Sequence, residues 1–283
     1  MKITAEQLRA LQLKQVEALI EIDRVCRQHN LRYYLAYGTL LGALRHKGFI
    51  PWDDDLDIMM PRKDYEMLLQ NGPQWIGEGF FLQNYRTTPE CSCQITELRV
   101  DGTVMKQLSS QSLNMHHGVF IDILPMDYIS SNLFKRSVDR FVLRALMTMC
   151  YAKFGSYPTK NPLFALMGKL LSTLFSMRTL RNMTEKLSMK YEKKPTGMVC
   201  APLSPYALCT ATKDVLSEDF FGEPTEVEFE GHSFYAPNNP DAILRQIYGE
   251  YMQFPPEEKR KPTHHIVELQ TELNPKTSSS CSS

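Results

Sequence analysis

Apolar positions recur at helical spacing near the start of the chain and again through its middle. Thr4-Ala-Glu-Gln7 has the form of a capping box and predicts a helix that runs to about Gln28. The apolar stripe of this helix comprises Leu8, Leu11, Val16, Leu19 and Ile20. Leu133–Tyr151 and Leu163–Glu192 are also helical in pattern, and Asn239–Gly249 has the proline and glycine that border a short helix.

Shorter apolar runs between these helices predict strands. The predicted strand segments are Arg32–Tyr37, Asp55–Met60, Phe80–Val104, Gly118–Pro125 and a hairpin over Val227–Ala236 that turns at Gly231. Leu40–His46 reads as a short helix that Gly48 would cap, and Pro61 suits the first turn of another helix, with Gly72 after its end. Strands and helices mixed in this order predict an α+β fold.

The densest chemistry lies in the acidic stretch Asp53, Asp54, Asp55 and Asp57. Strand alternation would place Asp55 and Asp57 on the same face, where two carboxylates can share a hard cation. Asp122 stands inside an apolar strand, and a buried carboxylate is costly unless it is paired or bound to metal. We therefore expect the two strands to be neighbours and the three carboxylates to form one metal site. The stretch lacks the glycine and glutamate positions of an EF-hand calcium loop.

A small-residue turn precedes the acidic stretch. Gly38-Thr39 lies between a predicted strand and a predicted helix, which would present backbone N–H groups to a phosphate. Arg45, His46 and Lys47 follow and add positive charge.

Composition limits the choice of partners. The formal net charge of the 283 residues is zero, so no general attraction to nucleic acid is expected. Residues 132–194, however, carry 13 Lys/Arg against 3 Asp/Glu. Residues 163–194 combine an apolar run with basic residues. We interpret this segment either as a core helix or as a peripheral contact with an anionic membrane. The polar N-terminus and the odd count of seven cysteines lead us to expect a reduced, cytoplasmic protein.

The segment Tyr37–Ile58 resembles the signature of LicD proteins, relatives of fukutin and fukutin-related protein. The likeness continues at Gly118–Asp127, Phe229–Gly231, Tyr235–Pro237 and Tyr248–Met252, so that it covers most of residues 5 to 262. It implies a nucleotidyltransferase-like fold, which is a small mixed sheet flanked by helices. The pattern of the basic helical middle adds the expectation of a subdomain inserted into or appended to this fold. We expect residues 1–131 to form the catalytic core, 132–194 the basic helical segment, 195–273 the C-terminal part of the catalytic domain, and 274–283 a disordered tail.

The resemblance also implies an activity. LicD-like proteins transfer phosphocholine from CDP-choline to sugars of teichoic acid or lipopolysaccharide, and the animal relatives transfer ribitol phosphate from CDP-ribitol. The shared reaction moves a phospho-alcohol to a glycan hydroxyl, free or lipid-linked, and releases CMP. By this resemblance Asp55, Asp57 and Asp122 are catalytic and hold magnesium or manganese, and Asp122 or Asp57 serves as general base.

Further roles follow for the surrounding residues. Gly38, Thr39 and Arg45 would bind phosphate. His46 and Lys47 would help them, and a surface role is the alternative for these two. Asp53 and Asp54 would orient the metal-binding pair. For a choline cargo, Trp52, Tyr34 and Tyr37 are candidates for an aromatic box, and packing in the core is the alternative for them. The candidate binding residues are Gly38, Thr39, Arg45, His46, Lys47, Trp52 and Tyr37.

Three other functions compete with this one. A nucleotidyltransferase that moves a nucleoside monophosphate to a small molecule or protein would share the carboxylate geometry. A glycosyltransferase could use Asp55-Leu-Asp57 as its Asp-x-Asp motif, but it needs neither Gly38-Thr39 nor Asp122. A non-catalytic binding module would be expected to lack a carboxylate, and all three are present.

Overall fold

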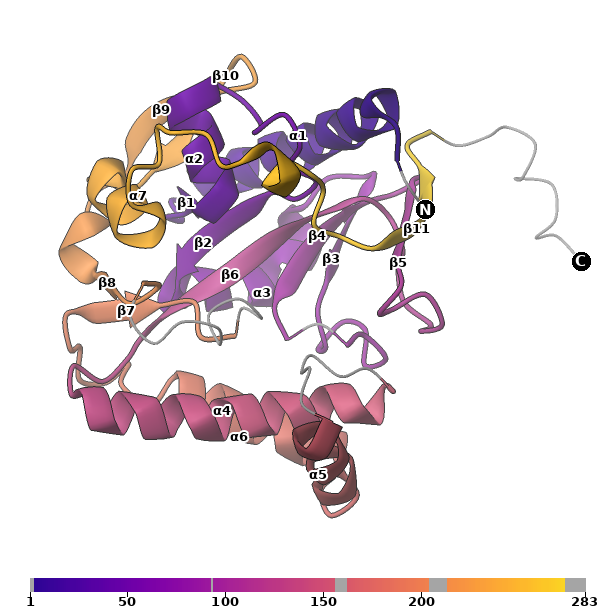
Figure 1. The fold of residues 1–283 in the computed structure, drawn as a ribbon, viewed down its shortest axis with the longest axis vertical. Coiled ribbons are helices and arrows are strands. Elements are labelled where there is room, and N and C mark those ends of the chain that lie inside the picture. The colour runs from indigo at the N-terminus through magenta and orange to yellow at the C-terminus, as the bar shows by residue number, and fades with distance from the viewer. Residues whose placement is uncertain (1–2, 93, 156–161, 204–212, 273–283) are drawn as a thin grey trace, which may run out of the picture.

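A mixed β-sheet lies at the centre of the protein (Figure 1). The computed structural model describes residues 3–92, 94–155, 162–203 and 213–272. The strands of the main sheet are β1 (Tyr34–Leu35), β2 (Asp57–Pro61), β3 (Phe80–Gln83), β4 (Thr96–Val100), β6 (Phe120–Tyr128), β7 (Met198–Cys200) and β8 (Leu216–Ser217). Their order is β1-β2-β6-β4-β3, and β7 pairs with β6 and β8. Strands β2 and β6 are parallel, and the other pairs are antiparallel.

Two small antiparallel sheets accompany the main one. Strand β5 (Val104–Gln107) pairs with β11 (Ile266–Gln270), and β9 (Thr225–Phe229) pairs with β10 (His232–Ala236). The second pair is the predicted hairpin, in which Glu230 and Gly231 adopt positive φ at the turn. The mixed sheet and its flanking helices confirm the predicted α+β class.

The described residues also form seven α-helices. They are α1 (Ala5–Gln28), α2 (Tyr37–His46), α3 (Arg62–Trp75), α4 (Leu133–Lys153), α5 (Pro162–Ser172), α6 (Met177–Ser188) and α7 (Pro240–Tyr248). Helices α1 and α3 pack on the sheet, whereas α4, α5 and α6 form a layer beneath it in the view of Figure 1. None of the described helices is long and apolar enough to cross a membrane.

The first helix begins as its sequence predicts. The Thr4 side chain accepts a hydrogen bond from the Gln7 backbone, and the Gln7 side chain accepts one from the Thr4 backbone. Leu11 and Leu19 are fully buried against the core, but Ile20 is exposed and Ile22 is buried in its place. The predicted stripe is therefore correct except at Ile20.

The segment around the glycine turn differs from the prediction. Strand β1 is only two residues long, and α2 already begins at Tyr37, so Gly38-Thr39 lies in the first turn of the helix. The left-handed residue at the end of α2 is Lys47, with φ 61°, and not Gly48. The structure remains compatible with phosphate binding here, because the first backbone N–H groups of α2 still point out of the helix N-terminus.

Other predicted boundaries also shift. Strand β2 begins at Asp57, so Asp55 lies in the preceding loop rather than in the strand. Helix α3 starts at Arg62 and continues through Gly72 to Trp75. The predicted helix over 163–192 is two helices, α5 and α6, because Ser176 caps a new N-terminus. The predicted tail 274–283 lies outside the described residues, and the predicted division of the chain into parts stays a prediction.

Candidate active site

Parallel pairing of β2 and β6 brings Asp57 and Asp122 together. The two residues are direct partners in the register, and the Asp122 backbone N–H donates to the Leu56 carbonyl oxygen at 2.9 Å. Burial raises the pKa of Asp57 well above its ordinary value, and the charges of Asp55 and Asp122 raise it further. The expectation that these two strands are neighbours is confirmed.

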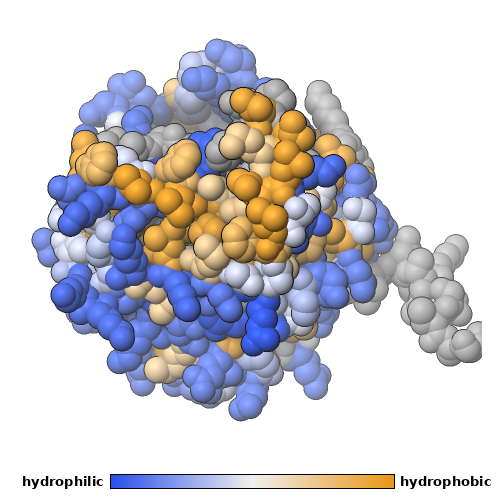
Figure 2. Space-filling view, turned by 90° about the horizontal axis from the view of Figure 1, so that it is seen from below, coloured by the Kyte–Doolittle hydropathy of each residue, from blue (hydrophilic) through white to orange (hydrophobic). Residues whose placement is uncertain are grey.

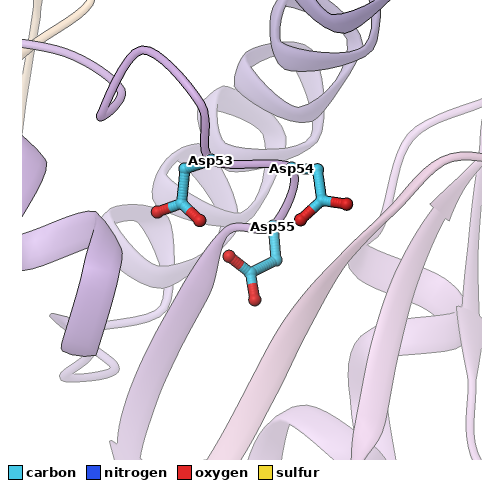
Figure 3. Close-up of side chains that lie close together, drawn as sticks. All are labelled: Asp53, Asp54 and Asp55. Atoms are coloured by element: carbon cyan, nitrogen blue, oxygen red, sulfur yellow. The ribbon is translucent and has the colours of Figure 1, made fainter. Parts of the chain in front are cut away.

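The loop before β2 adds three more carboxylates (Figure 3). One carboxylate oxygen from each of Asp53, Asp54 and Asp55 lies within 4.8 Å of the other two. Burial raises the pKa of Asp53 to about 9, and the charge and hydrogen bond of Asp55 act in the same direction. A divalent cation bound beside Asp53 would offset the cost of ionising this buried carboxyl.

Asp54 faces a different part of the chain. Its buried carboxylate accepts hydrogen bonds from the Thr263 and His264 backbone N–H groups at 3.1 and 3.0 Å, and from the Thr263 hydroxyl at 3.1 Å. His264 Nδ1 lies 3.2 Å from Asp54 Oδ1. Burial lowers the pKa of His264, but the hydrogen bond and charge of Asp54 outweigh burial and raise it to about 9. Asp54 thus attaches the C-terminal segment to the acidic loop.

Sequence reasoning missed His264 as a site residue. The charges of Asp55 and Asp122 also act on its imidazole, so it lies within the electrostatic reach of the acidic site. A signal was available, since two adjacent histidines follow Thr263 in a chain that has only seven.

Helix α1 holds the acidic loop in place. Gln12 Nε2 donates to the Asp53 carbonyl oxygen at 2.9 Å, and Gln15 Nε2 donates to the Asp54 carbonyl oxygen at 3.1 Å. Gln15 Nε2 also donates to the Phe120 carbonyl oxygen at 3.3 Å, at the start of β6. These buried amides fix the loop relative to β6, and they are polar exceptions within the apolar face of α1.

A buried charge pair adjoins Asp122 on its other side. Glu97 of β4 is the register partner of Asp122 and accepts from Arg99 Nε at 2.9 Å. The Arg99 guanidinium lies 4.4 Å from the Phe120 ring and donates to the Gly118 carbonyl oxygen. Burial raises the pKa of Asp122 well above its ordinary value, Glu97 raises it further, and Arg99 opposes both. The sequence held a signal for this pair, because Glu97 and Arg99 are opposite charges two residues apart in the otherwise uncharged run Thr96–Val100.

The donor types fit a hard divalent cation, although among the described residues the three carboxylates that come within 4.8 Å of one another are Asp53, Asp54 and Asp55 rather than the predicted set Asp55, Asp57 and Asp122. Asp122 Oδ1 is buried without a hydrogen-bond partner, and no described residue donates a hydrogen bond to the Asp57 carboxylate. Oxygen ligands of this kind suit magnesium or manganese. A bound cation would stabilise the ionised forms of Asp53, Asp57 and Asp122, whose pKa values are raised, and it would give Asp122 Oδ1 a partner.

Gly38 and Thr39 support the acidic residues directly. A Cβ atom on Gly38 would lie 2.7 Å from Asp53 Oδ2, so only glycine leaves room for that carboxylate. Thr39 Oγ1 accepts a hydrogen bond from the Asp57 backbone N–H at 2.9 Å, which leaves its own proton to donate. No described side chain caps α2, so its N-terminal N–H groups remain candidates for a phosphate.

The basic residues at the other end of α2 contact the chain itself. Arg45 Nη1 donates to the Tyr251 carbonyl oxygen at 2.6 Å, and Arg45 Nε donates to His46 Nε2 at 2.9 Å. Lys47 is exposed. Phosphate binding by Arg45, His46 and Lys47 stays a prediction, and the structure gives Arg45 the additional task of holding the loop after α7.

The aromatic candidates are divided among different surroundings. The Trp52 ring lies 6.3 Å from the Phe254 ring, and the Arg260 guanidinium lies 5.7 Å from the Trp52 ring. Tyr34 is buried in the core, where its hydroxyl donates to the Gly222 carbonyl oxygen at 2.6 Å. Trp52 thus accepts a cation in this structure, whereas Tyr34 packs in the core.

Two tyrosines border the acidic residues. Tyr37 is half-buried, and burial followed by the charges of Cys200 and Asp57 raises its pKa. Burial also raises the pKa of Tyr248, and the charges of Asp57 and Asp53 add to the effect. Tyr248 was not predicted as a site residue, although it opens one of the motifs quoted above.

Comparison with known proteins identifies relatives. Residues 30–138 match the family described as LicD/FKTN/FKRP, nucleotidyltransferase domain. The chain is 29% identical to "Lipopolysaccharide cholinephosphotransferase LicD" of Haemophilus influenzae over 264 residues, or 92% of this chain and 97% of that protein. It is 42% identical to an uncharacterized protein of Rickettsia prowazekii over 64 residues, 23% of this chain and 24% of that protein. It is 27% identical to "Mannosyltransferase regulator 4" of Saccharomyces cerevisiae over 116 residues, 36% of this chain and 9% of that protein.

Proposed function

Because the chain belongs to the LicD/FKTN/FKRP nucleotidyltransferase-domain family, we propose that it transfers a phospho-alcohol from a CDP-activated donor to a glycan hydroxyl and releases CMP. The observation that carries this proposal is the parallel register of Asp57 and Asp122 inside the family-matched residues. This register places Asp57 and Asp122 opposite each other, next to the acidic loop. Asp122 Oδ1 has no hydrogen-bond partner there among the described residues.

The cargo we propose is phosphocholine, and the donor is CDP-choline. Support comes from the Haemophilus influenzae relative, which is named a lipopolysaccharide cholinephosphotransferase and matches this chain almost from end to end. By the same reasoning the acceptor is a sugar hydroxyl of a cell-surface glycan or of its lipid-linked precursor. The reaction would take place at the cytoplasmic face of the membrane.

The acidic residues divide the chemical work. Asp55, Asp57 and Asp122 would hold magnesium, and Asp53 lies close enough to Asp55 to join them. When bound, the ion neutralises the charge that builds on the pyrophosphate as it is cleaved. Asp54 would keep the loop in place through Thr263 and His264 rather than act on the substrate.

Proton transfer is the second task. The raised pKa of Asp122, caused first by burial, makes its carboxylate a stronger base than an ordinary aspartate. The Asp122 carboxylate oxygen that does not hold the ion would take the proton of the acceptor hydroxyl. The acceptor oxygen then bonds to the phosphorus of the phospho-alcohol, and the bond from that phosphorus to CMP breaks. The N-terminal N–H groups of α2 would orient the donor phosphates.

Release of CMP tests the proposal. Purified protein is incubated with magnesium and, separately, CDP-choline, CDP-ethanolamine, CDP-glycerol and CDP-ribitol, with a glycan acceptor. We expect CMP release to be greatest from CDP-choline and to fall about a thousandfold in Asp57→Asn and in Asp122→Asn. Asp101→Asn, a matched change at an exposed turn, should keep the wild-type rate.

Two outcomes would contradict this function. Release of pyrophosphate from a nucleoside triphosphate, with transfer of the nucleoside monophosphate, would favour the nucleotidyltransferase alternative. CMP release that Asp57→Asn leaves unchanged would show that the acidic site is not the catalytic site.

A further inference from the structure

The outer face of α4 is apolar and exposed. Phe134 is 78% exposed and Phe141 is 65% exposed, and Val138 and Val142 lie between and beside them. These positions follow the spacing i, i+4, i+7 and i+8, which gathers them on one side of the helix. Exposed phenylalanines in such a row are unusual for a free surface, so this face requires an occupant.

Helix α5 extends the same face. A Cβ atom on Gly168 would lie 2.8 Å from Thr148 Cγ2, so α5 packs closely on the C-terminal half of α4. The opposite side of α5 and the turn after it are exposed at Leu163, Leu166, Met167, Leu170, Leu171 and Leu174. With the four α4 residues these form the α4–α5 apolar surface, and Figure 2 shows a broad hydrophobic area on this underside of the molecule.

Exposed basic side chains lie on α4, α5 and the neighbouring helix α6, and we call them the basic border of this surface. Lys135, Lys169, Arg178 and Lys186 are exposed, and none of them forms an ion pair with a described residue. The nearby acids are neutralised, since Asp139 pairs with Lys190 at 2.6 Å and Glu185 pairs with Arg86. The border therefore keeps its positive charge.

Helix α6 contributes little to this surface. Leu180 is buried against Leu146 and Cys150 of α4, and Arg181 is buried and donates to the Cys91 carbonyl oxygen at 2.6 Å. We therefore assign the membrane contact to α4 and α5, instead of to the whole of residues 163–194 as the sequence predicted.

We propose that the α4–α5 apolar surface docks this protein on the surface of a bilayer that contains anionic lipid. The two helices would lie in the plane of the interface, with phenylalanine and leucine side chains among the acyl chains and the basic border on the headgroups. A second copy of this chain fits less well, because a symmetric contact would bring the two positive borders together. The inference goes beyond the proposed transfer reaction, since docking requires neither donor nor acceptor.

Vesicle binding tests the apolar part. The full-length protein is sedimented with vesicles of phosphatidylcholine alone or with phosphatidylglycerol added. We expect binding to the anionic vesicles that weakens at high salt, and a loss of affinity of about tenfold or more in the double variant Phe134→Ser, Phe141→Ser. The matched control Leu13→Ser, Leu108→Ser removes two exposed leucines elsewhere and should bind as wild type.

Charge reversal tests the border. The triple variant Lys135→Glu, Lys169→Glu, Arg178→Glu should lose the preference for anionic vesicles, whereas Lys259→Glu with Lys261→Glu should keep it. Equal melting temperatures confirm that each variant folds. Vesicle binding by wild type without CMP release would leave docking intact and count only against the transfer reaction.

Three results would overturn the proposal. They are wild-type protein that fails to bind anionic vesicles, binding that the double phenylalanine change does not weaken, and a dimer that this change dissociates while no vesicle binds. The last result would assign the surface to a second copy of the chain.

Discussion

Single residues in the acidic site are held at a cost to stability. Burial and the charges of Asp55 and Asp122 raise the pKa of Asp57, so ionised Asp57 is unfavourable in the absence of a cation. Gly38 meets a similar demand, because any side chain there would displace the Asp53 carboxylate. Strain of this kind is expected where a protein holds a ligand site ready for use.

At the scale of single residues, we predict that Asp57→Asn weakens metal binding and raises the stability of the metal-free protein. In EDTA the variant should melt higher than wild type, by about 2–4 °C for each kcal/mol of repulsion removed. Excess magnesium should raise the melting temperature of wild type and not that of the variant, because a cation stabilises only a state that binds it. Asp101→Asn should respond to magnesium as wild type does, and an equal response from Asp57→Asn would contradict the ligand assignment.

At the scale of elements, β6 is joined to α3 as well as to β2. Asp127, near the end of β6, accepts two hydrogen bonds from Arg62 at the start of α3, at 2.6 and 2.5 Å. Their side chains are 0% and 4% exposed. This pair explains the aspartate that closes the motif Gly118–Asp127 as a structural residue, and it fixes α3 against the strand that carries Asp122.

We predict that Asp127→Ala lowers the free energy of unfolding by about 3–5 kcal/mol, because the buried Arg62 guanidinium then keeps only the half-buried Glu66 as an ion-pair partner. The double variant Arg62→Met, Asp127→Leu should recover most of this loss. Glu17→Ala, which removes an exposed ion pair with Lys14, should cost less than about 1 kcal/mol. Urea unfolding measures all three, and a double variant as unstable as Asp127→Ala would exclude this explanation.

At the scale of the whole molecule, distant segments of the chain meet at the acidic loop. Helix α1 binds the loop through Gln12 and Gln15, and the C-terminal segment binds it through Thr263 and His264. Strand β11 then pairs with β5 and secures that segment. The site is therefore closed by segments from both ends of the described chain.

We predict a pH-dependent contribution of His264 to stability. Because its pKa is raised from 6.5 to about 9 in the fold, its contribution is fully present below pH 6.5 and is lost as pH rises through about 9. This interval corresponds to about 3 kcal/mol. Unfolding in EDTA from pH 6 to pH 10 should show the gap between wild type and His264→Gln shrinking by about that amount. A gap that stays constant with pH would show that His264 is neutral in the fold.

Local sequence determined the elements whose signals are local. The capping box of α1, the hairpin at Gly231 and the helix that begins at Pro240 all form where propensity and spacing predicted them. The acidic stretch and Asp122 were likewise marked by the sequence, because carboxylates among apolar residues are costly without a ligand or partner. The boundaries near Gly38 and Asp55 were wrong, since tertiary contacts decide where a short strand or helix begins.

Only the tertiary structure decided what surrounds those residues. Strand pairing set Asp57 opposite Asp122 and brought in Glu97, and the return of the chain brought His264 to Asp54, across 210 positions. No local pattern encodes such contacts, because they depend on register and on loop closure. The opening stretch thus specified the ligand types, and the fold determined which carboxylates face one another, which are tied down, and that the apolar face left uncovered belongs to α4 and α5.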